Sequence, residues 1–345
     1  MPTFPLLALD QKTIEKIADF SEIIELFRLS LCSKRVRNLV KQHAISMSSK
    51  MKLDVKWSSD NSTLYANRAE SKTDWWFHDP RHRWVPKKHE CEHRNIGGVE
   101  MELCHSCPCQ TAIVSDIQEL AMLKFLEFLV DTFAAEITCV NLHVKDNECF
   151  LEILKSSCFS KFPFLGVGEG IVTHEEMALI LGNNALESCS TSCYVEAGFV
   201  YKKPIAIQSV KIDNAQWFSR ENLLNLKSSK SRFGRPLKEE DFNDFIRQWY
   251  NSEEYQYQDL EYLVVRGMNL LDFDKMIKDL PTFPGTPKKQ RLMSYYDHGR
   301  VISETRDIRR PSDGMLATIV KPRGKAGSDC FLFVVWHDFD PSPLE

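Results

Sequence analysis

The chain has 345 residues, of which 43% are hydrophobic and 27% are charged, and its formal net charge is −4. This length and composition are typical of a globular protein with two or three domains. A net charge so close to zero gives no overall positive field for nucleic acid or for an anionic membrane, so we expect neither as a partner.

We also expect neither secretion nor insertion into a membrane. The longest uninterrupted apolar run is seven residues, from Cys330 to Trp336, whereas a membrane-spanning helix needs about 20. The N-terminus lacks the basic and apolar segments of a signal peptide. Eleven cysteines, an odd number, then predict reduced intracellular thiols rather than a disulfide framework. We expect the protein in the cytoplasm, the nucleus or both.

The first forty residues are rich in apolar side chains, which make up 19 of the 37 residues from Phe4 to Val40. We predict a helix over 14–20, a second over 23–31 with Ser21 as its N-cap, and a third with Ser33 as its N-cap. The second helix is apolar around most of its circumference. Three helices in about 40 residues cannot bury that surface alone, so either the rest of the chain or a separate protein must cover it.

Two segments of this region resemble the F-box of the nematode-expanded kind, namely Phe4-Pro5-Leu6-Leu7 and the run from Ile23 to Arg35. The resemblance implies a three-helix domain that docks on the Skp adaptor of SCF (Skp–cullin–F-box) ubiquitin ligases and, through it, on cullin. The residues implied in this contact are Phe4, Pro5, Leu6, Leu7, Ile23, Leu26, Phe27, Ser30 and Arg35.

Residues 46–115 have no helical periodicity, and we predict a connector rich in short strands. Leu53, Val55 and Trp57 alternate as in a half-buried strand. Within this connector, residues 89–93 match the pattern H-E-x-x-H, in which a helix places two histidines on zinc beside a glutamate base. Pro86 before the motif and two glycines after it leave little room for such a helix. A zinc-dependent hydrolase using His89, Glu90 and His93 is therefore a remote alternative.

A structural zinc site is a second possibility in the same segment. Cys104 and Cys107 have chelating spacing, and Cys91 and His93 could complete a tetrahedral set. The spacing between Cys91 and His93 is tighter than in most zinc sites, so these residues are predicted to be unligated thiols and surface histidines. We predict no metal and no other cofactor.

From Asp116 onward, helical and strand-like patterns alternate. Helices are predicted over 117–133, 149–154, 173–181, 219–224 and 242–249, and strands are predicted to begin at 137, 162, 185, 205, 226 and 260. The last five strand starts are 23, 20, 21 and 34 residues apart, mostly within the 20–29 range of leucine-rich repeats. Periodicity alone leaves open a short solenoid or another α/β fold.

Four segments of this region resemble the type-2 F-box-associated domain: 211–226, 237–249, 260–263 and 307–336. The resemblance favours the first alternative. We therefore predict an α/β protein in which an N-terminal three-helix F-box precedes a degenerate leucine-rich-repeat-like strand and helix body. The predicted divisions are the F-box at 1–45, the strand-rich connector at 46–115, the F-box-associated domain at 116–270, and a C-terminal loop and strand hairpin at 271–345.

The two resemblances together imply a non-enzymatic adaptor. It would be the substrate-recognition subunit of an SCF-type E3 ubiquitin ligase, which holds a target protein through its C-terminal body. Tethering raises the local concentration of target lysines at the ubiquitin-loaded enzyme and needs no catalytic group from the adaptor. An F-box scaffold protein acting outside the ligase is the main alternative. The sequence does not identify the residues that contact the target.

Overall fold

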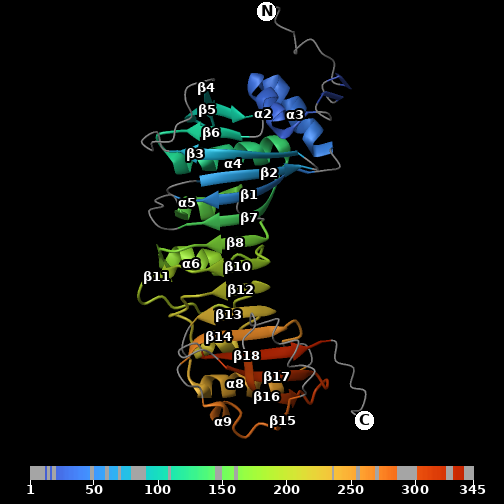
Figure 1. The fold of residues 1–345 in the computed structure, drawn as a ribbon, viewed down its shortest axis with the longest axis vertical. Coiled ribbons are helices and arrows are strands. Elements are labelled where there is room, and N and C mark those ends of the chain that lie inside the picture. Colours follow the sequence, from blue (N-terminus) through green and yellow to red (C-terminus); the bar gives the residue numbers. More distant parts are fainter. Residues whose placement is uncertain are drawn as a thin grey trace, which may run out of the picture. The chain divides into compact units, whose positions relative to one another are not determined.

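The structure is a computed structural model that forms two compact units, residues 1–168 and 169–345. Both units combine helices with strands (Figure 1). The residues that it describes are 12–13, 16–17, 21–46, 50–58, 62–68, 71–78, 91–107, 110–143, 150–158, 162–234, 237–253, 257–268, 272–285, 301–323 and 329–337. Among these residues, no helix is long and apolar enough to span a membrane.

The first unit is built on one mixed sheet with helices packed on it. Its strands are β1 (Lys52–Trp57), β2 (Ser62–Arg68), β3 (Ser71–His78), β4 (Cys91–Ile96), β5 (Val99–Cys107), β6 (Gln110–Val114), β7 (Glu136–Leu142) and β8 (Phe164–Val167). They lie in the order β8-β7-β1-β2-β3-β6-β5-β4. The pairs β1–β7, β7–β8 and β3–β6 are parallel.

The helices of the first unit are α2 (Ile23–Cys32), α3 (Lys34–Ser46), α4 (Gln118–Phe133) and α5 (Phe150–Lys155). Helix α4 packs on β3, β4 and β5, and α2 and α3 lie beside it (Figure 1). The alternation of Leu53, Val55 and Trp57 is confirmed, since all three are buried in β1. The sheet face that they share is apolar, so it requires this helical cover.

The starts of α2 and α3 follow different capping patterns. Ser33 caps α3 as predicted, because its Oγ accepts the N–H of Val36 at 3.2 Å. The prediction that Ser21 caps α2 is wrong: the N-cap is Glu22, whose N–H donates to the Glu25 carboxylate at 3.0 Å. Ser21 instead donates its hydroxyl hydrogen to the carbonyl of the preceding turn. Of the first helix, predicted over 14–20, the structure describes only 16–17, which are helical, as are 12–13 just before it.

The second unit begins with short strand and helix segments. They are β9 (Ile171–Val172), α6 (His174–Leu181), β10 (Ser188–Thr191), β11 (Tyr194–Val195), β12 (Ser209–Ile212), α7 (Arg220–Leu224), β13 (Lys230–Gly234), α8 (Glu239–Tyr250) and β14 (Tyr262–Met268). Strands β10, β12, β13 and β14 are parallel neighbours in chain order. They start at residues 188, 209, 230 and 262, so the spacing predicted from the sequence is close to the observed one.

The same sheet ends in antiparallel strands. These are β15 (Thr282–Pro284), β16 (Val301–Arg309), β17 (Leu316–Arg323) and β18 (Asp329–Trp336), with the short helix α9 (Phe273–Met276) before them. The order continues from β14 as β18-β17-β16-β15. The predicted hairpin of β17 and β18 is confirmed by their antiparallel pairing.

Helix α8 forms the centre of the second core. Its four apolar residues at helical spacing, Phe242, Phe245, Ile246 and Trp249, are all fully buried. Phe242 stacks on Phe331 of β18, and Trp249 meets Phe333 edge-on at 5.3 Å between ring centroids. A mixed α/β fold is thus confirmed, whereas the four predicted domain divisions remain a prediction.

Candidate protein-binding surfaces

The apolar face of α2 is covered by the chain itself. Phe27 has no exposed surface, and its ring centroid lies 5.8 Å from that of Trp75 in β3 and 5.1 Å from that of Phe125 in α4. The side chain of Phe128 closes the same cluster at 6.0 Å. Apolar side chains in such a cluster are removed from water without any partner protein.

The expectation that these side chains contact the Skp adaptor stays a prediction, and in the chain by itself they are buried. Ile23, Leu26, Phe27 and Ser30 are each at most 2% exposed. The Ser30 hydroxyl donates to the Phe27 carbonyl at 2.6 Å, so its polar group is satisfied within the helix. Of the predicted Skp contacts, only Arg35 is described and exposed. The other four, Phe4, Pro5, Leu6 and Leu7, lie outside the described residues.

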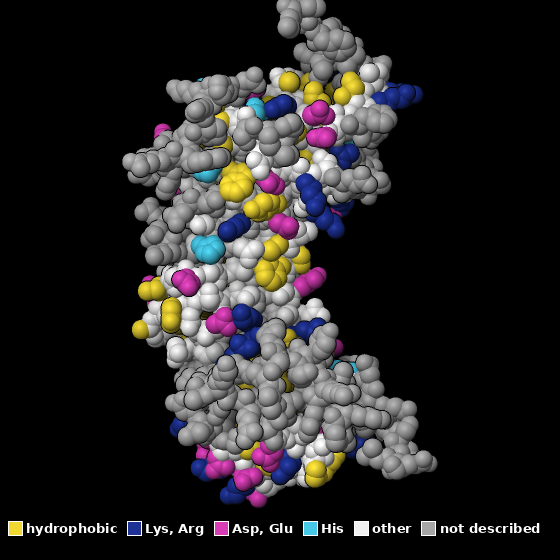
Figure 2. Space-filling view, viewed as in Figure 1, with side chains coloured by type: hydrophobic (Ala, Val, Ile, Leu, Met, Phe, Trp, Pro, Cys, Tyr) yellow, Lys and Arg dark blue, Asp and Glu magenta, His cyan; other side chains and the backbone are white. Residues whose placement is uncertain are grey.

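The exposed part of α2 is its opposite face. Glu25, Arg28 and Cys32 are exposed and Leu29 is half-buried. At 100° per residue these four positions fall within one arc of the helix. We call this arc, together with Arg35 at the start of α3, the open F-box face. Charged and hydrophobic side chains alternate on the part of the surface where α2 and α3 lie (Figure 2).

Helix α3 is fastened to α4 by polar contacts. The Arg37 guanidinium lies over the Phe128 ring at 4.8 Å, and its Nε donates to the Ser30 carbonyl at 3.4 Å. Lys41 forms an ion pair with Asp131. Because α2 and α3 are held in this way, the open F-box face has a fixed place on the first unit.

A second surface lies on the parallel strands of the second unit. A hollow of about 550 Å³ is lined mostly by half-buried residues of β10, β12 and β13, together with the buried Cys189 and Val210 and with Glu261 and Tyr262 at the start of β14. Its rim carries two ion pairs, Lys211 with Asp213 at 3.1 Å and Lys230 with Glu261 at 3.2 Å. Basic and acidic side chains adjoin in this part of the unit (Figure 2). A surface of mixed charge without a deep apolar pocket suits a protein partner better than a small molecule.

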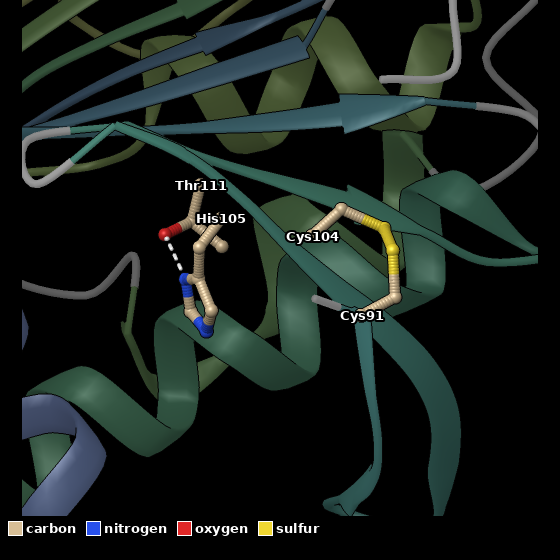
Figure 3. The surroundings of a disulfide bond; sticks show 4 residues. All are labelled: Cys91, Cys104, His105 and Thr111. Carbon is tan, nitrogen blue, oxygen red and sulfur yellow. Dashed lines mark hydrogen bonds between the residues drawn. A yellow bond between two sulfur atoms is a disulfide. The ribbon is translucent and has the colours of Figure 1, made fainter. Parts of the chain in front are cut away.

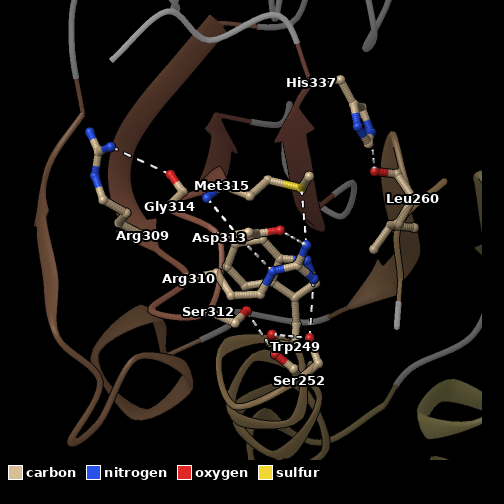
Figure 4. A network of polar contacts seen from close by, with 10 residues as sticks. All are labelled: Trp249, Ser252, Leu260, Arg309, Arg310, Ser312, Asp313, Gly314, Met315 and His337. Carbon is tan, nitrogen blue, oxygen red and sulfur yellow. Dashed lines mark hydrogen bonds and ion pairs between the residues drawn. The ribbon is translucent and has the colours of Figure 1, made fainter. Parts of the chain in front are cut away.

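The C-terminal part of this unit contains a buried arginine. Arg310, in the turn between β16 and β17, has no exposed surface. It donates to Asp313 at 3.0 Å and to Ser252 at 3.1 Å, and it lies 5.2 Å from the Trp249 ring at the end of α8 (Figure 4). The hydrogen bonds from Arg310 to Asp313 hold the pKa of this carboxyl below its usual value. The network fixes the turn on α8, which is a structural role.

The cysteine and histidine segment departs most from expectation. Cys91 and Cys104 form a disulfide between β4 and β5, with their Cα atoms 4.2 Å apart (Figure 3), so the prediction of unpaired thiols is wrong for these two. His105 lies apart from it and hydrogen-bonds to Thr111 at 3.0 Å. His93 is exposed on a strand, not on the helix that the H-E-x-x-H chemistry requires.

The remaining residues of the two zinc hypotheses are only partly visible. His89 and Glu90 lie outside the described residues, and Cys107 is described only as part of β5. The structure instead brings Glu102 to Cys91 and Cys104, with the ligand atoms of all three within 4.8 Å of one another. Sequence reasoning missed Glu102.

A signal for this arrangement is present in the sequence. Gly97 and Gly98 both have positive φ, at 62° and 88°, and form the two-residue turn that joins β4 to β5. Two adjacent glycines are typical of such hairpin turns, and a two-residue loop fixes the strand register. Counting outward from this turn pairs Cys91 with Cys104.

Two other cysteine thiols are unreactive. Burial raises the pKa of Cys189 to about 12 and that of Cys193 to about 11. The thiolate is the reactive form of cysteine, so both residues are inert at neutral pH.

Comparisons with known proteins match two segments of the chain, one in each unit. A family model of the F-box domain matches residues 6–46, which include α2 and α3, and a model described as F-box associated matches 203–265, from before β12 into β14. An uncharacterized protein of Caenorhabditis elegans is 23% identical over 98% of this chain and 80% of its own length. No solved structure matches.

The two matched segments are of kinds that are typically non-catalytic adaptor domains, found in proteins of SCF ubiquitin ligases. More narrowly, one segment matches an F-box domain and another an F-box-associated domain, so the resemblance seen in the sequence is confirmed.

Proposed function

We propose that the protein is the substrate-recognition subunit of an SCF-type ubiquitin ligase, acting in the cytoplasm or the nucleus. The observation that carries this proposal is the order of two domains on one chain, an F-box at 6–46 and an F-box-associated segment at 203–265. Such a subunit works by tethering. It raises the concentration of target lysines near the ubiquitin-loaded enzyme and supplies no catalytic group of its own.

The Skp adaptor docks, in this proposal, on the open F-box face and on the segment that precedes it. Phe27 and its buried neighbours do not touch Skp in this proposal; they hold α2 against β3 and α4. Besides Glu25, whose carboxylate accepts the N–H of Glu22, the face offers Arg28, Arg35, Cys32 and the half-buried Leu29. Its two arginines against one glutamate fit a partner with acidic and apolar side chains. The buried residues therefore orient the contact rather than form it.

The target protein binds the second unit in this account. The parallel pairing of β10, β12, β13 and β14, with α7 and α8 between them in the chain, supports the proposal of a short leucine-rich-repeat-like solenoid. The hollow lined by Lys211, Lys230 and Arg232 is its proposed target surface. Stacked repeats commonly use an open strand face of this kind for extended protein contacts.

The Skp contact can be tested without disturbing the core. Arg28→Glu with Arg35→Glu reverses two exposed charges on the open F-box face, and Lys52→Glu with Lys56→Glu makes the same change of charge on exposed positions of β1. We expect the first pair to weaken binding of purified Skp adaptor by at least about tenfold in calorimetry, because reversed charges meet a matched surface. The β1 pair should bind as the wild type does.

Equal binding by all three proteins would overturn the docking surface, and failure of the wild type to bind Skp would overturn the proposed function. The alternative of a scaffold outside the ligase has its own outcome: Skp then binds, but addition of cullin gives no ternary complex on a sizing column.

A further inference from the structure

The disulfide region contains a group of metal ligands that the adaptor function does not use. Sγ of Cys91, Sγ of Cys104 and the Glu102 carboxylate lie within 4.8 Å of one another. Cys104 is 2% exposed, whereas Cys91 and Glu102 are half-buried. Two thiolates and a carboxylate at this separation are within reach of a single tetrahedral zinc ion.

Strand geometry supplies a fourth ligand on the same face. Cys91 pairs with Cys104, and His93 pairs with Glu102 two positions along the hairpin. Side chains of alternate residues in a strand share one face, so all four side chains project from the same side of β4 and β5. His93 is exposed and lies outside the 4.8 Å group, so its imidazole has to turn toward the sulfur atoms to serve as a ligand.

We propose that Cys91, Cys104 and Glu102, with His93 as the fourth ligand, bind a zinc ion when the disulfide is reduced. Thiolate and imidazole ligands favour zinc over magnesium or calcium, which take oxygen ligands. The disulfide and the bound zinc ion are two alternative cross-links between β4 and β5.

The disulfide is converted into the zinc site in two steps, reduction and metal binding. A dithiol reductant gives two electrons to the Cys91–Cys104 disulfide, the S–S bond breaks, each sulfur gains one proton, and the reductant becomes a disulfide. Zinc then forms two Zn–S bonds and displaces one proton from each thiol. Metal binding thus releases two protons and holds both sulfur atoms as thiolates.

Either cross-link stabilises the edge strand of the first sheet. Among the strands that the structure describes, β4 is the last in the order, and its one pairing is with β5. An edge strand with one neighbour is the part of a sheet most exposed to fraying or to pairing with another chain. A link between the two strands keeps β4 in place in both redox states.

The test uses the full chain and cobalt(II) as a spectroscopic probe. After reduction and removal of the dithiol under nitrogen, one equivalent of cobalt should give thiolate-to-metal absorption and the visible bands of a tetrahedral site, and zinc should displace it. Protein with an intact disulfide should give neither signal. Cys91→Ser and Cys104→Ser should abolish the thiolate band, and Glu102→Ala or His93→Ala should weaken affinity by more than about tenfold.

Two matched variants serve as controls. Glu92→Gln changes a carboxylate on the other face of β4, and Cys32→Ser removes an exposed thiol of α2, so both should leave the cobalt affinity unchanged. A second readout needs no variant: zinc should protect Cys91 and Cys104 of the reduced wild type from alkylation, as mapped by mass spectrometry. Reduced wild type without cobalt absorption, or without zinc protection, would overturn the proposal.

Discussion

A single buried charge shows how individual residues set the stability of the second unit. Arg310 is fully buried, and its guanidinium is satisfied by Asp313, by the Ser252 hydroxyl and by the Trp249 ring. A buried charge is tolerated only when it is paired and hydrogen-bonded. Removal of the carboxylate would leave the arginine uncompensated, which costs far more than the pair itself contributes.

We predict that Asp313→Asn lowers the free energy of unfolding by about 3 kcal/mol at neutral pH. Chemical denaturation followed by tryptophan fluorescence measures this change, because Trp249 lies beside the guanidinium. Asp279→Asn is the control, since its ion pair with Arg247 is long, at 3.7 Å, and exposed; such pairs contribute about 0–1 kcal/mol. Equal effects of the two substitutions would contradict the assigned role.

The Arg310–Asp313 pair also makes the free energy of unfolding depend on pH. Hydrogen bonds from Arg310 lower the pKa of Asp313 from its usual 3.8, so the folded state favours the charged carboxylate. Its stabilisation is complete above the usual pKa and is lost as the pH falls through the lower folded value. The stability difference between wild type and Asp313→Asn should therefore shrink below about pH 4.

At the level of elements, α2 is both an F-box helix and part of the first core. Its residues lie about 50 positions from β3 and about 100 from α4 along the chain, and the Phe27 cluster joins all three. Hydrophobic periodicity identifies the apolar face of a helix, but not which distant segment covers it. The sequence therefore predicted the surplus of apolar surface on α2 and left its cover open.

We predict that Phe27→Ala destabilises the first unit by about 3–5 kcal/mol, because the lost ring leaves a cavity among Trp75, Phe125 and Phe128. Urea denaturation monitored by circular dichroism measures this loss. Ile45→Ala on α3 is the matched control, since Ile45 is 63% exposed and its truncation should change stability by less than about 0.5 kcal/mol. A Phe27→Ala protein as stable as Ile45→Ala would show that α2 is not part of the core.

Elements with strong local signals were predicted well. The capping box of Thr173 and Glu176 opens α6, and the apolar spacing of Phe242 and Trp249 marks α8. By contrast, the polar segment 46–115 gave a clear pattern only for β1, because the register of the other strands depends on partners far away in sequence. The Cys91–Cys104 pair follows from the glycine turn only once β4 and β5 are known to be a hairpin.

For the whole molecule, the structure changes how the F-box can work. An uncovered F-box would offer its apolar stripe to Skp, whereas here that stripe is already buried against β3 and α4. Release of α2 from this core would expose Phe27, Leu26 and Ile23, at a cost of roughly 1.5–3 kcal/mol for each side chain. Docking on the open F-box face avoids this cost, and this is the central claim of the account.

Amide hydrogen exchange on the full chain, alone and saturated with purified Skp adaptor, tests that claim most directly. The account predicts slower exchange in α2 and at the start of α3 when Skp is bound, with unchanged exchange in β3 and α4, because the core stays closed. Faster exchange in β3 and α4 on Skp binding would contradict it, since that result requires α2 to leave Trp75 and Phe125.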